Sequence, residues 1–276
     1  MAVVLITGCS SGIGRASAAR FVRSGHTVYA TARRTETLAE LAVLGCRTLA
    51  LDVTDEASMV DAVAAAAADG APVEVLVNNA GYGEYGTVEE TPLDRVRAQF
   101  ETNVFGLARM VQLVLPGMRA AGRGRIVNIG SMGGRLVFPA GGYYHASKYA
   151  VEALSDALRF EVAPFGIQVV VVEPGLIRSG FGETAAGTLS HAADASGPYA
   201  GLNAAADREL TSGYANERLS ATPDDVAVVV ERAATADSPH ARYVVTPAAR
   251  ALIHTRRLLG ARVFDRYLRH QFRPSA

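Results

Sequence analysis

The chain has 276 residues, 49% of them hydrophobic, and equal numbers of basic and acidic side chains, 27 of each. A neutral chain without a basic stripe argues against nucleic acid as a partner, and no apolar run approaches the roughly 20 residues that span a bilayer. The two cysteines form neither a CxxC pair nor a metal-ligand spacing, so we expect no metal site and a reducing, cytoplasmic compartment.

Short runs of β-branched residues alternate with longer stretches of helical character. The run at 169–172 is apolar on both faces, as expected of a parallel strand covered by helices. We therefore predict a single doubly wound Rossmann domain of the α/β class over residues 1–276, with a seven-stranded parallel sheet. The predicted strands are 3–7, 27–32, 47–53, 73–78, 125–130, 167–173 and 242–246. The clearest predicted helices are 12–24, 92–107, 144–162 and 223–236.

A glycine-rich turn, TGCSSGIG at residues 7–14, joins the first predicted strand to the first helix. Glycines allow a tight turn, and the N-terminus of the following helix presents unpaired N–H groups to a pyrophosphate. Because the turn opens a strand–helix–strand unit, it predicts a dinucleotide site. The residues expected to contact the phosphates are Gly8, Ser10, Ser11, Gly12, Ile13 and Gly14.

The end of the second predicted strand indicates which dinucleotide is bound. An NAD-selective site usually has an acidic residue here to hold the ribose 2′-hydroxyl. This chain instead has Arg33 and Arg34, and an arginine forms charge-assisted bonds to a 2′-phosphate. We therefore predict NADP(H), held by Arg33 with help from the Ser11 hydroxyl; the alternative is that both arginines are solvated surface residues.

Tyr144 and Lys148 lie four residues apart on a predicted helix and so share one face. An ammonium beside a phenol favours the phenolate and brings the pKa of the tyrosine toward working pH. Lys148 is the only lysine against 26 arginines, and a lysine supplies a compact point charge that arginine does not. Ser131 closes the fifth predicted strand, and Asn103 stands within a predicted helix where its low propensity indicates a polar role.

Together these residues resemble the short-chain dehydrogenase/reductase family over residues 3–179. The motifs that carry the resemblance are TGxxxGxG at 7–14, NNAG at 78–81 and YxxxK at 144–148. The resemblance implies a catalytic tetrad of Asn103, Ser131, Tyr144 and Lys148. It implies further cofactor contacts from Asp52, Val53, Asn79, Ala80, Gly81, Tyr144, Lys148, Pro174, Gly175, Ile177 and Ser179, the last standing where the family usually has threonine.

The same resemblance implies an oxidoreductase acting on CH–OH groups. Ser131 is expected to bond the substrate oxygen, Tyr144 to exchange a proton with it, Lys148 to lower the tyrosine pKa and bond the nicotinamide ribose, and Asn103 to position a water. The TGCSSGIG turn and the arginine after the second strand look like the NADP(H)-using branch that includes hydroxysteroid and retinol dehydrogenases. That branch suggests a bulky, apolar ketone, aldehyde or alcohol as substrate.

The C-terminal third has two expected parts. Residues 175–215 are rich in small residues, and such a stretch in a compact domain is usually a functional loop, so we expect a substrate lid. Residues 248–276 are predicted to form an arginine-rich helical tail that packs on the lid or forms an oligomer contact, with membrane-surface binding as the alternative. A homodimer or homotetramer is usual in the family. The predicted substrate contacts are Ser131, Leu136, Phe138, Tyr144, Leu176 and Phe181.

Two other functions are compatible with the fold. A nucleotide-sensing regulator would bind NADP(H) without catalysis, but such a protein usually loses the tyrosine or the lysine, and both are present. An epimerase or dehydratase is the other alternative, although sugar-modifying relatives usually carry TGxxGxxG and a larger C-terminal domain.

Overall fold

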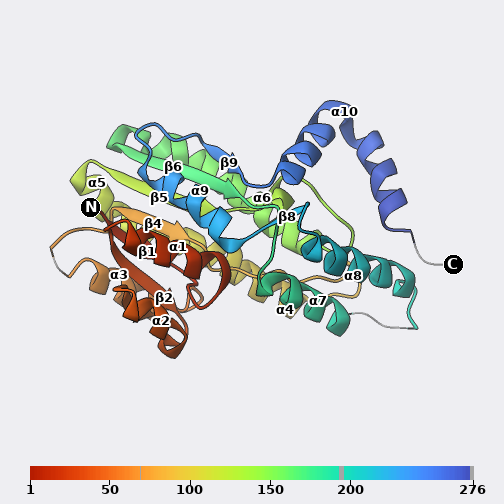
Figure 1. Cartoon of the computed structure of the whole chain (residues 1–276), viewed down its shortest axis with the longest axis horizontal. Helices are drawn as coiled ribbons and strands as arrows, with labels where there is room; N and C mark the ends of the chain where they lie inside the picture. Colours follow the sequence, from red (N-terminus) through yellow and green to blue (C-terminus); the bar gives the residue numbers. More distant parts are fainter. Residues whose placement is uncertain (69, 193–195, 274–276) are drawn as a thin grey trace.

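Seven short strands form one parallel sheet in the computed structural model, which describes residues 1–68, 70–192 and 196–273. Across the sheet the strands follow the order β3-β2-β1-β4-β5-β6-β9, and helical crossovers cover both faces (Figure 1). The strands are β1 (Val3–Ile6), β2 (Thr27–Ala32), β3 (Arg47–Ala50), β4 (Val75–Asn78), β5 (Gly124–Ile129), β6 (Ile167–Glu173) and β9 (Arg242–Val244). The predicted doubly wound Rossmann fold is therefore confirmed.

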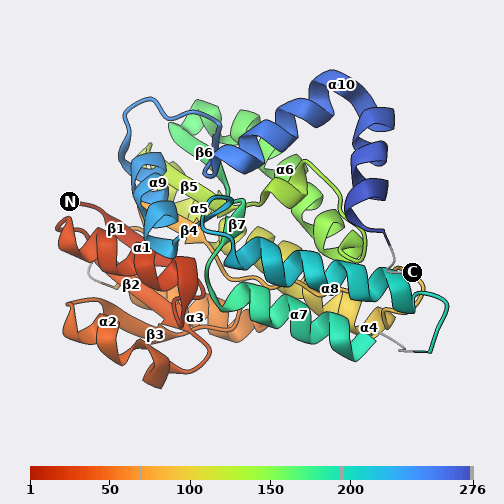
Figure 2. The same ribbon diagram turned by 45° about the vertical axis from the view of Figure 1, so that its right-hand side comes forward.

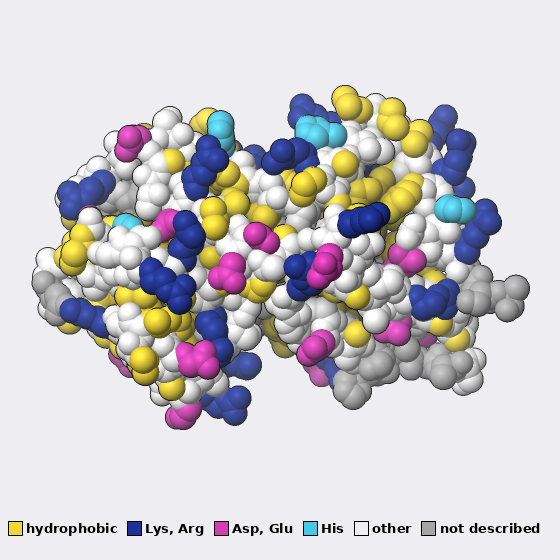
Figure 3. Space-filling model, viewed as in Figure 1, with side chains coloured by type: hydrophobic (Ala, Val, Ile, Leu, Met, Phe, Trp, Pro, Cys, Tyr) yellow, Lys and Arg dark blue, Asp and Glu magenta, His cyan; other side chains and the backbone are white. Residues whose placement is uncertain are grey.

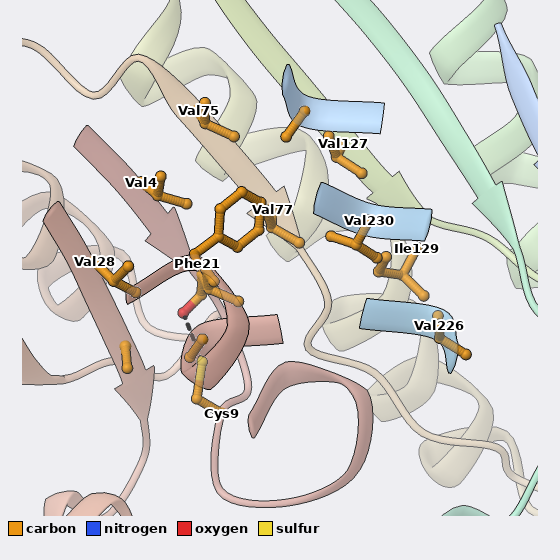
Figure 4. Packing of buried hydrophobic residues seen from close by; sticks show 14 of the residues in the cluster. Val4, Cys9, Phe21, Val28, Val75, Val77, Val127, Ile129, Val226 and Val230 are labelled. Carbon is orange, nitrogen blue, oxygen red and sulfur yellow. Dashed lines mark hydrogen bonds between the residues drawn. The ribbon is translucent and has the colours of Figure 1, made fainter. Parts of the chain in front are cut away.

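Alternate side chains of each strand enter two hydrophobic cores, one on each face of the sheet. In β1, Val4 and Ile6 belong to one core and Leu5 to the other. The first core is closed by α1 and α9, and Phe21 of α1 lies among valines of β1, β4 and α9 (Figure 4). The second core is closed by α3, α5 and α6. These helices are α1 (Gly12–Arg23), α3 (Glu56–Ala66), α5 (Leu107–Ala121), α6 (Gly142–Val162) and α9 (Pro223–Thr235).

The predicted helix over 92–107 is in fact interrupted. α4 (Leu93–Phe100) is followed by a π-helical segment, η2 (Glu101–Gly106), before α5 begins. A π segment inserts an extra residue into a helix and often accompanies a functional site, and a pattern of period 3.6 does not reveal it. Several predicted strands also end earlier than expected; β3 stops at Ala50 and β9 at Val244. The short connecting helices are η1 (Thr35–Leu38), α2 (Ala39–Val43), η3 (Met132–Gly134) and η4 (Ala163–Phe165).

The region predicted as a lid forms two helices, α7 (Gly180–Ala192) and α8 (Ala200–Ala215), which lie side by side (Figure 2). They are flanked by two short strands that pair with each other, β7 (Leu176–Ile177) and β8 (Ser220–Ala221). The predicted tail is α10 (Pro247–Gln271). Residues 193–195 of the predicted lid and 274–276 of the predicted tail lie outside the described residues. Within the described ranges, no helix has the length and apolarity needed to cross a membrane.

Candidate active site

The glycine-rich turn after β1 is closely packed against the chain that follows β4. A Cβ on Gly14 would lie 2.3 Å from the carbonyl oxygen of Gly8, and Gly8 itself has a φ of 73°. The side-chain amide of Asn79 donates to the carbonyl oxygens of Thr7 and Gly8, both at 2.9 Å. Only glycine fits at these two positions, so the turn is held in one shape by packing and by Asn79.

The N-terminus of α1 carries amide groups that no side chain caps. Ser11 stands at the N-cap with no side-chain hydrogen bond, and the first turn contains no acidic residue. The first N–H groups of a helix have no partner within it, and together with the helix dipole they favour an anion. Ser11, Gly12 and Ile13 border the main cavity. The turn therefore fits a pyrophosphate group, because the first N–H groups of α1 can donate hydrogen bonds to its oxygens.

One cavity of about 1530 Å³ runs along the carboxyl ends of the strands and is also lined by residues of α7 and α8. Nearly all the predicted cofactor residues line it, namely Gly8, Ser10, Ser11, Gly12, Ile13, Arg33, Asp52, Val53, Asn79, Ala80, Gly81, Tyr144, Lys148, Pro174, Gly175, Ile177 and Ser179. Gly14 does not line the cavity, because it packs directly against the Gly8 carbonyl. Arg33 reaches the cavity from the end of β2, whereas Arg34 does not.

Ser131 and Tyr144 meet at the wall of this cavity. The Ser131 hydroxyl oxygen accepts the N–H of Gly133 at 2.9 Å, which fixes the position of the hydroxyl. Ser131 and Tyr144 also form a hydrogen bond, which lowers the pKa of the tyrosine. Burial acts in the opposite direction and dominates, raising the pKa of Tyr144 to about 12.

Lys148 lies one turn after Tyr144 on α6 and is buried, with 7% of its surface exposed. Its Nζ donates to the carbonyl oxygen of Ile129 at 2.9 Å. Burial lowers the pKa of Lys148 to about 8, and the Glu152 carboxylate opposes this shift. Burial dominates the pKa of Tyr144, and the expected lowering of that pKa by Lys148 stays a prediction.

Asn103, in the π segment η2, is buried and bonded to its neighbours. Its Nδ2 donates to the Tyr82 carbonyl at 2.9 Å and to the Ser147 hydroxyl at 3.0 Å, while its Oδ1 accepts the Tyr82 N–H at 3.1 Å. Asn103 thus pins the chain after β4 to α6. A Cβ on Gly81 would lie 2.9 Å from Asn103 Oδ1 and 3.7 Å from Lys148 Nζ, so both polar atoms flank this glycine. Asn103 does not itself line the cavity.

The part of the cavity beyond Tyr144 is walled by apolar side chains. Three predicted substrate residues, Phe138, Leu176 and Phe181, line it together with Ser131 and Tyr144. The structure does not bring Leu136 to the cavity: the residue is 1% exposed and packs with Ile253 and Phe264 in a separate cluster. The cause is that the loop after β5 turns this side chain toward α10. We therefore do not retain Leu136 as a substrate contact.

Several residues that line the cavity are not predicted by any pattern in the sequence. Tyr85 stacks on Tyr144, with ring centroids 5.6 Å apart, and Tyr214 of α8 lies 6.3 Å from Phe181. Further walls come from Leu210 of α8 and from Leu252, Tyr267 and Phe272 in the C-terminal segment. These residues come from segments far apart in the chain, so spacing along the sequence does not predict that they meet.

His145 also borders the cavity, and it is neutral. Its Nδ1 lies 3.1 Å from the carbonyl oxygen of Gly133, which can only accept, so Nδ1 carries the proton. Burial lowers the pKa of His145 to about 4. The imidazole therefore adds no positive charge beside Tyr144 at neutral pH.

The chain is similar in sequence to several known proteins. The family described as short chain dehydrogenase matches residues 2–188. The chain is 35% identical over 268 residues to the oxidoreductase YbbO of Escherichia coli (strain K12), a match that covers 96% of this chain and 93% of YbbO. It is 43% identical over 180 residues to a 3-ketodihydrosphingosine reductase of Bacteroides thetaiotaomicron. That match covers 65% of each protein, just under two thirds of the relative's length.

Solved structures resemble the chain over most of its length. A short-chain dehydrogenase from Streptomyces avermitilis superposes with a TM-score of 0.77 at 34% identity, covering 97% of this chain and 96% of the other. A serine dehydrogenase complexed with NADP⁺ superposes with a TM-score of 0.76 at 29% identity, covering 88% and 94%. The similarity thus extends over most of the chain and is not confined to the matched motifs.

Proposed function

The chain belongs to the short-chain dehydrogenase/reductase family, and from this premise we propose that it transfers hydride between NADP(H) and the carbonyl carbon of a ketone or aldehyde. Membership makes the protein an oxidoreductase of CH–OH groups that uses a nicotinamide cofactor. The observation that carries the proposal is the meeting of Ser131, Tyr144 and Lys148 at one wall of the cavity that also receives the uncapped N-terminus of α1.

The proposed mechanism assigns a separate task to each polar group. The bound nicotinamide supplies or accepts the hydride, and the chain orients the substrate and moves the proton. Ser131 donates a hydrogen bond to the substrate oxygen, and Tyr144 exchanges its phenolic proton with the same oxygen. The buried ammonium of Lys148 stabilises the phenolate that remains and bonds the ribose hydroxyls. Asn103 holds a water beside Lys148, since its Oδ1 and Lys148 Nζ flank Gly81.

We assign NADP(H) rather than NAD(H) because of the charge at the end of β2. Arg33 borders the cavity, as does Ser11, so the two side chains supply a guanidinium and a hydroxyl donor. An arginine can bond a phosphate through two parallel N–H groups, and such bonds are stronger than those between neutral groups. No carboxylate follows β2 at this point in the sequence, where the NAD-selective pattern has one.

The proposed substrate is a bulky, apolar carbonyl compound or the corresponding alcohol. Phe138, Leu176 and Phe181 are the proposed contacts, and the lid and tail enlarge the same apolar chamber. A pocket of this kind binds through apolar surface and places a few polar groups to orient the reacting atom. The relative named as a 3-ketodihydrosphingosine reductase supports reduction of a ketone.

We also propose a homodimer or homotetramer in a reducing, cytoplasmic compartment. The helices that hold Asn103 and Tyr144 expose Phe105, Leu154 and Phe160, and exposed apolar side chains on packed helices favour association. Both cysteines are buried free thiols, which supports the compartment. Light scattering after size exclusion tests the assembly, because a monomer has a mass of 28.9 kDa; a purely monomeric protein contradicts this proposal.

The activity is tested with a panel of ketones, aldehydes and alcohols that includes steroids and long-chain ketones. Oxidation of NADPH is followed by absorbance, and each substrate is repeated with NADH. We expect turnover of apolar ketones with a preference for NADPH. Cofactor binding with no turnover across the panel would instead favour the regulator, and turnover with equal use of both cofactors would contradict the assignment of Arg33.

A further inference from the structure

The C-terminal helix α10 forms an elbow that stands out from the rest of the protein (Figure 1). The helix changes direction at Gly260, whose φ of 75° and ψ of −179° are essentially restricted to glycine. Three apolar side chains at the elbow are open to solvent: Leu258 is 77% exposed, Leu259 57% and Val263 40%. We call these three residues, together with the flanking Arg256, Arg257 and Arg262, the elbow surface. Exposed apolar side chains gathered at a protruding point indicate an interaction surface.

The same segment is strongly basic, although the chain as a whole is neutral. Residues 247–273 contain seven arginines and one aspartate, so the rest of the chain has six more acidic than basic residues. Among the residues that the structure describes, no carboxylate forms an ion pair with any of these arginines. Figure 3 shows dark blue side chains around the yellow ones at the crest of α10. These cations are therefore available to an anionic partner.

Apolar side chains flanked by arginines that form no ion pair with a described carboxylate are the pattern of a helix that lies in a membrane interface. We propose that the elbow surface docks on a bilayer that contains anionic lipids, with Leu258, Leu259 and Val263 entering the headgroup region. A nucleic acid would engage the arginines but leave the leucines in water. An anionic bilayer satisfies both features, because it offers negative charge at its surface and apolar volume just beneath.

The position of the elbow relates this docking to the substrate chamber. Leu252 lines the chamber before the elbow, and Tyr267 and Phe272 line it after the elbow. The far arm is tied to the body by a hydrogen bond from Gln271 to Glu209. Docking therefore places one wall of the chamber beside the bilayer, from which a water-insoluble ketone enters. This last step rests on the proposed function, whereas the docking itself does not.

The docking is tested by cosedimentation of the full-length protein with vesicles. One set contains phosphatidylcholine alone, and the other contains equal parts of phosphatidylcholine and phosphatidylglycerol. We expect binding to the anionic vesicles to be at least about tenfold tighter, and to weaken with added salt because the attraction of the arginines is screened. No binding, or equal binding to both sets, overturns the proposal.

Two double variants assign the binding to the elbow surface. Leu258→Ser with Leu259→Ser removes the apolar part, and Arg257→Glu with Arg262→Glu reverses the charge. Each should weaken binding to anionic vesicles by at least about tenfold. Matched controls on α2 and α1, Val43→Ser and Arg23→Glu, change exposed residues away from the elbow and should bind as the wild type does.

Size exclusion and turnover of a soluble ketone separate the remaining outcomes. If the elbow variants change the oligomeric state and leave vesicle binding intact, the surface contacts a second copy of the chain and the proposal is wrong. If vesicle binding depends on the elbow but no carbonyl compound is turned over, the docking stands and the proposed function fails alone.

Discussion

The ammonium group of Lys148 lies 2.9 Å from the main-chain carbonyl oxygen of Ile129, the last residue of β5. This bond ties helix α6 to the edge of the sheet where the cavity opens. A carbonyl dipole compensates only part of the cost of burying a positive charge. The pKa of Lys148 is low because the burial of its charge is only partly compensated.

The pKa of Lys148 is directly measurable because the chain has no other lysine. Protein labelled with ¹³C-lysine gives a single side-chain resonance for each labelled carbon, and its titration should give a pKa of about 8. As pH rises through that value the ammonium is lost, so kcat/KM for carbonyl reduction should fall on the alkaline side. A titration near the ordinary value of 10.5 would contradict the argument from burial.

Replacement of Tyr144 by phenylalanine should remove the proton donor and keep the ring that stacks on Tyr85. We expect kcat to fall by about 100- to 10,000-fold, the usual contribution of general acid–base catalysis, while NADPH still binds. Tyr143→Phe is the matched control, because that hydroxyl donates to the main-chain carbonyl oxygen of the exposed Val88. Steady-state kinetics and fluorescence titration of NADPH compare the two variants. Substantial turnover by Tyr144→Phe would show that Tyr144 is not the proton donor.

Cofactor choice should depend on Arg33 and not on its neighbour. Arg33→Asp removes a donor to the 2′-phosphate and adds an acceptor for a 2′-hydroxyl. Hydrogen bonds to charged groups contribute about 1.5–3 kcal/mol, so the ratio of kcat/KM for NADPH to that for NADH should fall by roughly 10- to 100-fold. Arg34→Asp makes the same charge change outside the cavity and should leave the ratio nearly unchanged. Equal shifts in both variants would point to a general charge effect.

Gly14→Ala should damage the phosphate turn. The new methyl group would lie 2.3 Å from the Gly8 oxygen and 2.5 Å from Asn79 Nδ2, so the turn must move. Overpacking of this kind costs about 1–3 kcal/mol of unfolding free energy, and the displaced turn should bind NADPH more weakly. Gly180→Ala serves as the control, because a Cβ there meets nothing within 4 Å. Urea denaturation that gives the same stability for both variants would contradict the close packing of the turn.

The sheet and the shared helix face of Tyr144 and Lys148 were predictable because their signals are local. Runs apolar on both faces indicate buried parallel strands, and a spacing of four residues places Tyr144 and Lys148 on one side of a helix whatever surrounds them. Ser131 follows from topology, since the carboxyl ends of parallel strands share one edge of the sheet. Each inference needs only a few neighbouring residues, so a single sequence is enough.

Other features depend on contacts between distant segments. Leu136 is only five residues from Ser131, but its direction is set by packing against Ile253 and Phe264 of α10. The π segment around Asn103 arises where α4 meets α5, and no residue pattern marks it. The high pKa of Tyr144 reflects how much protein covers the phenol, a quantity that exists only in the folded chain.

The groups proposed to carry out chemistry and most of those proposed to enclose the substrate belong to different parts of the chain. The first set lies on α6 or directly after β5 and consists of Ser131, Tyr144 and Lys148. Helices α7 and α8, by contrast, form an insertion between β6 and α9. Such an insertion can be replaced without changing any strand of the seven-stranded sheet. A chimera that carries the 180–215 segment of another family member should therefore acquire that donor's substrate preference while it keeps its own proton-transfer chemistry.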